Sequence, residues 1–112
     1  MINVSIEDIL KTTNWISSED GTKVYDVIHQ HLKAGEEVAL SFKGGVFIVT
    51  PFLNAAIGRL YSGEFSEGDL ASRLKYVDCD EFASDKITRV VANAKAYYAD
   101  PALHDSVNEG VS

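Results

Sequence analysis

Hydrophobic and polar residues follow their clearest pattern in the middle of the chain, over residues 37–61. An apolar strand at residues 38–42 is followed by a Lys-Gly-Gly turn and a second apolar strand at residues 46–49. Beyond Thr50 and Pro51, apolar residues recur every three or four positions, which predicts a helix with one buried face. Thr50 is expected to cap this helix through its side-chain oxygen, and Pro51 to occupy the first helical position.

The rest of the chain also shows the two apolar periodicities that are typical of strands (every second residue) and of helices (every third or fourth residue). Alternating apolar residues predict an edge strand at residues 1–6 and a further strand at residues 74–79. Apolar residues on one helical face predict helices over about residues 17–33 and 85–99. Three shorter segments complete the pattern: a lead-in that fits a short helix or an extended stretch (7–16), one helical turn (69–73) and a loop (80–85).

This order of elements predicts an α/β fold in a single domain. The chain has 112 residues, which is long enough to bury one hydrophobic core, and it contains no internal repeat or linker. We expect a mixed sheet of about four strands packed by about three to four helices. Residues 1–100 should form the domain, and residues 101–112, which lack periodicity, should form a flexible C-terminal tail.

The charge and the cysteine content narrow the kind of protein. The formal net charge is −7 at pH 7, which disfavours direct binding to nucleic acid or to an anionic membrane. No apolar run reaches the length of about 20 residues that a membrane helix needs. A single cysteine excludes an intramolecular disulfide. We therefore expect a cytoplasmic protein, with the oligomeric state left open and a homodimer compatible with the sequence.

The chain contains cysteine and histidine, but their sequence positions do not favour a catalytic nucleophile or a shared metal site. Cys79 lies between Asp78 and Asp80, whose negative charges would raise the pKa of its thiol and weaken it as a nucleophile. His29 and His31 are two positions apart on a predicted helix and so point in different directions. We therefore expect a non-enzymatic protein with no catalytic residues, no cofactor and no metal.

The central stretch, VALSFKGGVFIVTPFLNAAIGRL, resembles the centre of the STAS-like domains, the sulfate-transporter and anti-sigma-factor-antagonist type. It is most similar to the small stand-alone bacterial and phage-associated branch of unknown function. The resemblance implies a sheet flanked by helices, no catalysis, and regulation through protein–protein contact. Antagonists of this type bind a histidine-kinase-like ATPase according to phosphorylation of a Ser or Thr at the start of the central helix.

This chain departs from that pattern at two places. Ser41 stands where the family usually has Asp at the end of a strand, and Pro51 stands at the usual phospho-acceptor position. Thr50, one residue earlier, is the hydroxyl that could serve as acceptor instead. The first hypothesis is accordingly a regulatory protein that binds a protein partner through the strand–helix junction. We expect the contact to consist of four residues: Thr50, Phe52, Asn54 and Ile57.

Two alternatives remain open from the sequence. An acidic inhibitor or decoy, of phage or mobile-element type, would use carboxylates to cover a basic, nucleic-acid-binding surface of its target. Its candidate surface comprises Glu64, Glu67, Asp69, Asp78, Asp80 and Glu81. A small-molecule binding module or weak enzyme is the third hypothesis. Salt distinguishes the first two, because a charge mimic loses affinity steeply as ionic strength rises.

Overall fold

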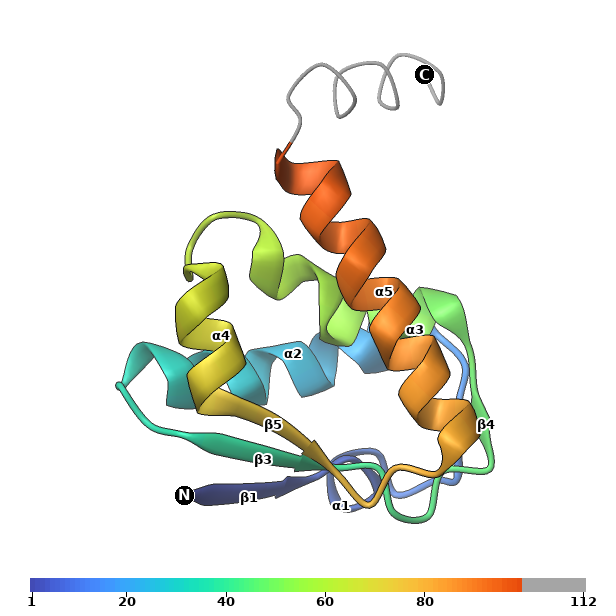
Figure 1. Cartoon of the computed structure of the whole chain (residues 1–112). Helices are drawn as coiled ribbons and strands as arrows, with labels where there is room; N and C mark the ends of the chain where they lie inside the picture. The colour runs from blue at the N-terminus through green and yellow to red at the C-terminus, as the bar shows by residue number, and fades with distance from the viewer. Residues whose placement is uncertain (100–112) are drawn as a thin grey trace.

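The computed structural model describes residues 1–99 of the chain (Figure 1). The tail expected at residues 101–112 lies outside these described residues. The main sheet has three strands, β1 (Ile2–Ser5), β3 (Val38–Ser41) and β5 (Leu74–Val77), in the order β1-β3-β5. Both pairings are parallel, and the register aligns Val4, Leu40 and Tyr76 across the sheet. β3 is central and β1 lies at an edge, as the sequence predicts.

The helices cover one face of this sheet. They are α2 (Ser18–Lys33), α3 (Thr50–Ala56), the 3-10 helix η1 (Gly58–Tyr61), α4 (Glu67–Arg73) and α5 (Glu81–Ala99). Figure 1 shows α2, α3, α4 and α5 together on the same side of the three strands. A further short helix, α1 (Ile6–Leu10), directly follows β1.

A second, two-stranded parallel ribbon lies apart from the main sheet. It pairs β2 (Asn14–Trp15) with β4 (Phe47–Ile48), so that Trp15 is opposite Ile48. The structure thus confirms the predicted α/β fold and refines its strand arrangement. All the strand pairings within the described residues are parallel, and the expected strand at residues 46–49 belongs to the ribbon.

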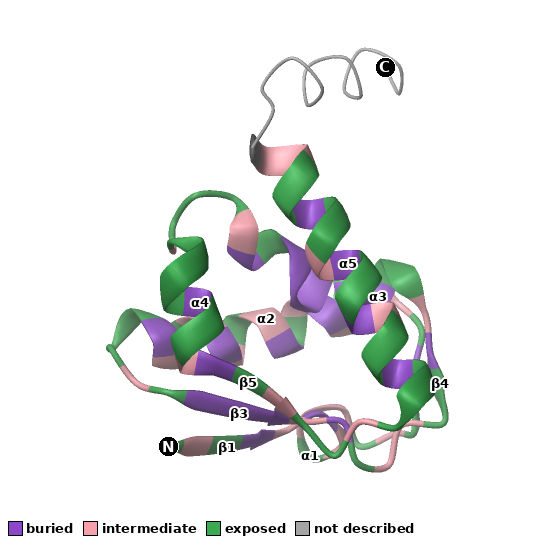
Figure 2. Cartoon of the chain, in the orientation of Figure 1, coloured by how far each residue is buried: buried purple, intermediate pink, exposed green. Residues whose placement is uncertain are grey.

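The core forms between the helices and the sheet because apolar residues alternate along the strands. Val4, Val38, Leu40 and Leu74 face the helices and are buried, whereas Asn3 and Lys75 on the other face are exposed. Figure 2 shows buried residues along β3 and at intervals on α2. Burial of these apolar surfaces is the main stabilising contribution to the fold.

The contact between α2 and α3 is unusually close because α2 carries Gly21 there. A Cβ atom at this position would collide with the Phe52 carbonyl oxygen and would lie 2.7 Å from the Ala55 Cβ. The absence of a side chain at Gly21 therefore allows the first turn of α3 to pack directly on α2. This contact fixes where α3, and the strand before it, lie in the molecule.

Two local predictions need correction. The loop expected at residues 80–85 is wrong, because α5 begins at Glu81. Asp80 makes this early start possible, since its side-chain oxygen accepts a hydrogen bond of 2.7 Å from the Ala83 N–H. Residues 7–16, which the sequence left open, contain both α1 and β2.

Candidate functional site

The junction between β4 and α3 was the predicted centre of the site. α3 begins at Thr50, and its N-cap residue is Val49, which has extended backbone dihedrals and makes no side-chain capping bond. The prediction that Thr50 caps the helix is therefore wrong. The Val49 carbonyl accepts the first helical hydrogen bond, from the Leu53 N–H at 3.2 Å, which places Thr50 one position inside the helix.

The four predicted partner-binding residues divide between surface and core. Thr50 and Asn54 are exposed. Phe52 and Ile57 are fully buried, because the apolar face of α3 packs against α2 and the Trp15 ring. The Trp15 and Phe52 ring centroids are 5.9 Å apart. The prediction that Phe52 and Ile57 contact a partner is therefore corrected: both side chains belong to the hydrophobic core.

A different set of apolar side chains is exposed around this junction. Phe47 is 62% exposed and Val46 66%, at the start of β4. Ile16, at the end of β2, is 57% exposed. The parallel register turns Trp15 and Ile48 inward, so Phe47 and Ile16 point to the outer face of the ribbon as diagonal neighbours.

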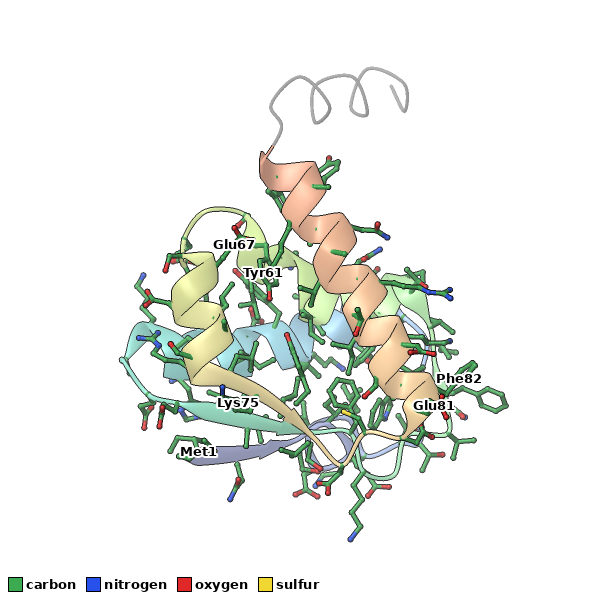
Figure 3. The ribbon with its side chains drawn as sticks, in the orientation of Figure 1. Met1, Tyr61, Glu67, Lys75, Glu81 and Phe82 are labelled. Carbon is green, nitrogen blue, oxygen red and sulfur yellow. The ribbon has the colours of Figure 1, made fainter. Side chains whose placement is uncertain are left out.

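The first turn of α5 adds an aromatic ring beside this ribbon. Phe82 is 69% exposed and projects from α5 away from the body of the molecule (Figure 3). Lys86 connects the two elements, because its Nζ donates a hydrogen bond of 2.6 Å to the Ile48 carbonyl and lies 4.6 Å from the centre of the Phe82 ring. We call the set Ile16, Val46, Phe47 and Phe82 the ribbon surface.

A polar pocket of about 240 Å³ adjoins the ribbon surface at the carboxyl ends of β3 and β5. We call it the carboxyl-end pocket. Its lining residues are Phe42, Lys43, Gly44, Gly45, Ile48, Asp78, Asp80 and Ala83.

Hydrogen bonds position the two carboxylates of this pocket. Asp78 has a left-handed backbone conformation (φ 58°), and its Oδ2 accepts a hydrogen bond of 2.6 Å from the Ser41 hydroxyl. Asp80 is held through Oδ1, which caps α5. Within the described residues, the remaining oxygens, Asp78 Oδ1 and Asp80 Oδ2, accept no hydrogen bond.

The six predicted acidic residues do not form one surface. Glu64, Glu67 and Asp69 lie around the start of α4, and Asp78, Asp80 and Glu81 lie between β5 and α5. Figure 3 shows Glu67 and Glu81 far apart on the molecule. The structure therefore brings together three of the six acids at each of two places.

The two acidic groups also differ in their ion pairs. Glu64 pairs with the His29 ring and lies 3.9 Å from Lys33, while Glu67 lies 3.6 Å from Lys95. Among the described residues, Asp78, Asp80 and Glu81 form no ion pair. The carboxylates beside the ribbon surface thus differ from Glu64 and Glu67 in having no cationic partner among the described residues.

Cys79 has the environment that the sequence indicated. Burial, together with the charges of Asp78 and Asp80, raises the pKa of its thiol. The two histidines bind different partners, since His31 pairs with Glu36 at 2.9 Å rather than with His29. Within residues 1–99, no three His, Cys, Asp or Glu side chains are grouped so that they could hold a metal ion.

A second pocket lies beside Asn54, between α3, η1 and α5. Its volume is about 290 Å³, and its lining residues are Asn54, Gly58, Asn93, Ala94, Tyr97 and Tyr98. The pocket is open and combines amide side chains with aromatic rings. Among these described lining residues, the titratable groups are the two tyrosine hydroxyls.

Sequence reasoning missed the ribbon surface. The sequence predicts a strand at residues 46–49 without indicating which of its side chains are exposed, and it places Phe82 in a loop. One signal was available: Val46, Phe47, Ile48 and Val49 are all apolar, yet a strand next to a one-sided core buries only alternate residues. The exposure of Phe82 depends on the position of α5 and leaves no comparable pattern in the sequence.

Comparison with known families gives one match. Residues 20–81 match the family described as a STAS-like domain of unknown function, and this segment is more than half of the chain. It runs from α2 to the first residue of α5, so it includes Val46 and Phe47 but not Ile16 or Phe82. No curated protein and no solved structure matches the chain.

No helix within residues 1–99 combines the length and the apolar character that crossing a membrane requires.

Proposed function

The chain belongs to the family of STAS-like domains of unknown function, and from this premise we propose that it is a non-enzymatic regulatory protein that acts by protein–protein contact. The contact surface is the ribbon surface together with the exposed start of α3, at Thr50 and Asn54. A histidine-kinase-like ATPase is the partner that the resemblance to antagonists suggests.

The observation that carries this proposal is the clustering of exposed apolar side chains. Six large hydrophobic residues are exposed within the described residues, and four of them form the ribbon surface. Aromatic side chains in such positions are typical anchors of protein interfaces, because they bury a large area with few rotatable bonds. A cluster of this kind, bordered by polar residues, supports a role in partner binding.

Thr50 gives the proposed contact a means of regulation. Its side chain is exposed and makes no capping bond, and Val49 alone separates Thr50 from the end of β4. A phosphate there would add roughly two negative charges at the border of the ribbon surface. Phosphorylation would therefore weaken the contact with a partner that relies on apolar burial at this place.

The acidic-inhibitor alternative receives less support. Its surface would require the six carboxylates to act together, but they lie in two groups. Glu64 and Glu67 are already engaged with His29, Lys33 and Lys95. Only the group at Asp78, Asp80 and Glu81 lies beside the ribbon surface, where it would contribute to the edge of an interface with an apolar centre.

Site-specific crosslinking in the native host tests the proposal. A photo-reactive phenylalanine analogue at position 47 should capture one discrete protein. The same analogue at position 75, exposed on the face of the main sheet that the helices do not cover, should not. The captured protein is then purified, and its affinity for the wild-type chain is measured by calorimetry. No adduct at position 47, or the same adducts at both positions, would contradict the proposal.

The regulatory part is tested with the same purified partner. Thr50→Glu should weaken binding, because a carboxylate covered by an apolar part of the partner loses its hydration. Thr88→Glu is the matched control, since Thr88 is also exposed but lies on α5 away from the junction. Equal affinities of both variants would remove Thr50 from the contact and leave the crosslinking result unaffected.

A further inference from the structure

We propose that the ribbon surface and the carboxyl-end pocket together bind a partner segment in which arginine or lysine alternates with apolar residues. The apolar side chains would lie on Phe47 and Phe82, and one basic side chain would enter the pocket between Asp78 and Asp80. This inference rests on the proposed function and names the chemical class of the partner.

The pocket has the composition that a long basic side chain requires. Its walls include the apolar residues Phe42, Ile48 and Ala83, against which the methylene groups of lysine or arginine can pack. Two carboxylates stand at its polar side. Its volume of about 240 Å³ is sufficient for one such side chain.

Each of the two carboxylates is held in position by one hydrogen bond, which leaves its second oxygen available. Ser41 and the Ala83 N–H each occupy one oxygen, of Asp78 and Asp80 respectively. The other oxygen of each accepts no hydrogen bond from the described residues, and neither residue has an ion pair there. A guanidinium group, with its fork of N–H donors, could bind both remaining oxygens.

Among the lining residues of the pocket, carboxylates outnumber cations. Lys43 lines the pocket, so the local balance there is two carboxylates against one lysine. Lys86 adds one positive charge at the border of the pocket, because its two contacts, the Ile48 carbonyl and the Phe82 ring, are uncharged. Arg89 is exposed about one helical turn further along α5. Glu81 adds a further carboxylate next to Phe82.

The same charges disfavour a second copy of this chain as the occupant. The chain carries a formal net charge of −7, so two copies facing each other here would bring acidic groups together. Like charges opposed across an interface are unfavourable, whereas a basic segment gains attraction and a faster encounter. The charge complementarity therefore selects a basic, apolar partner segment.

Three synthetic peptides of equal length test this inference directly. One alternates leucine with arginine, the second leucine with glutamate, and the third serine with arginine. Calorimetry with the wild-type chain at physiological salt should show binding of the first peptide only. Amide chemical-shift changes on binding should concentrate at residues 46–48 and 78–83.

Two double variants that each remove two negative charges distinguish binding in the pocket from a general effect of the net charge. The double variant Asp78→Asn/Asp80→Asn keeps the shape and the α5 cap but removes two charges, and it should lose roughly tenfold in affinity. The double variant Glu64→Gln/Glu67→Gln removes two charges on the other side of the molecule and should bind like the wild type. Phe82→Ser should also cost about tenfold or more.

The possible outcomes distinguish this inference from the proposed function. Equal binding of the glutamate peptide, or equal losses in both double variants, overturns the basic partner class. If no peptide binds while crosslinking at position 47 still captures a protein, the inference is wrong and the proposed function stands. If the arginine peptide binds as expected but no protein is captured, the surface chemistry is supported and the proposed regulatory role fails.

Discussion

Two regions of this molecule differ in whether their polar and aromatic side chains have partners within the chain. Around α4, Glu64 is paired with His29 and Lys33, and Glu67 with Lys95. At the ribbon surface, Phe47 and Phe82 are exposed, and the neighbouring carboxylates form no ion pair within the described residues. Glu64 and Glu67 thus have partners within the chain, whereas Phe47 and Phe82 are left available.

The difference indicates where function and where stability lie. Surface ion pairs such as those around α4 are worth little individually, but they hold the loop before α4 against α2 and α5. Exposed rings beside free carboxylates contribute little to the folded state and are retained at a cost in solubility. We infer that the region around α4 serves the fold and the ribbon surface serves binding.

The largest expected effect contrasts two phenylalanines five positions apart. Phe52 is fully buried against Trp15, so Phe52→Ala should lower the free energy of unfolding by about 3–5 kcal/mol. Phe47 is 62% exposed, so Phe47→Ala should change it by less than about 0.5 kcal/mol. Urea unfolding followed by circular dichroism measures both variants.

The variant with the smaller effect on stability should have a clear effect on partner binding. Phe47→Ala should weaken the partner contact while leaving the fold intact. A stability loss for Phe47→Ala that approaches the loss for Phe52→Ala would show that Phe47 is packed in solution, and would remove the contrast between the core and the ribbon surface.

A second prediction concerns pH and Tyr76 of β5. Burial and the neighbouring Tyr61 raise the pKa of Tyr76, so the folded protein holds this proton more firmly than the unfolded chain does. Below about pH 10 the phenol is protonated in both states and its contribution is complete. Above that value the unfolded chain loses the proton first, and the free energy of unfolding falls by up to about 1.4 kcal/mol per pH unit.

Urea unfolding of the wild type and of Tyr76→Phe between pH 8 and pH 11 measures this dependence. The variant should lose less stability over this range, because phenylalanine has no proton to release. Parallel curves for the two proteins would contradict the prediction. Thr50→Ala is a suitable control, since it should leave the pH dependence unchanged.

The arrangement of the main elements could be predicted from the sequence because periodicity reports which faces are buried. The central strand β3 and the helix α2 follow directly from their apolar spacing. The pairing of β2 with β4 could not be predicted, since two paired residues leave no periodic signal. The sequence predicts the start of α5 at about residue 85, four residues too late. Ala83 is buried on the same face as Ile87 and Val90, but its small side chain gives only a weak apolar signal.

The candidate site was predictable in position but not in composition. The strand–helix junction at Thr50 lies next to the ribbon surface, but the apolar residues chosen for binding, Phe52 and Ile57, are in the core. Amphipathic spacing identifies a helix face that will be buried and does not say whether the fold or a partner buries it. Here Gly21 settles the question, because it lets α2 cover that face.

A third prediction compares two helix starts. Ser66 caps α4, where its Oγ accepts a hydrogen bond of 3.0 Å from the Asp69 N–H. Ser66→Ala should therefore lower the free energy of unfolding by about 1 kcal/mol. Thr50→Ala should change it by less than about 0.5 kcal/mol, since Thr50 makes no capping bond. A loss of about 1 kcal/mol for Thr50→Ala as well would restore Thr50 as a cap.

The smallest expected effect concerns Cys79, which lies between Asp78 and Asp80 at the pocket. Its partial burial and both neighbouring charges raise the pKa of the thiol, so the reactive thiolate is scarce at neutral pH. Alkylation by iodoacetamide at pH 7 should be slower than that of a free cysteine model peptide. Asp78→Asn/Asp80→Asn should accelerate it, because removal of the two charges lowers the pKa again.

Partner binding by Cys79→Ser tests whether the thiol is needed for function. If the ribbon surface works by contact alone, this variant should bind the partner like the wild type, since the thiol is partly buried and makes only a weak 3.5 Å bond to the Val77 carbonyl. Loss of the biological activity with binding and stability intact would instead identify the thiol as chemically active. That result would replace a contact surface with a reactive centre at the same end of the sheet.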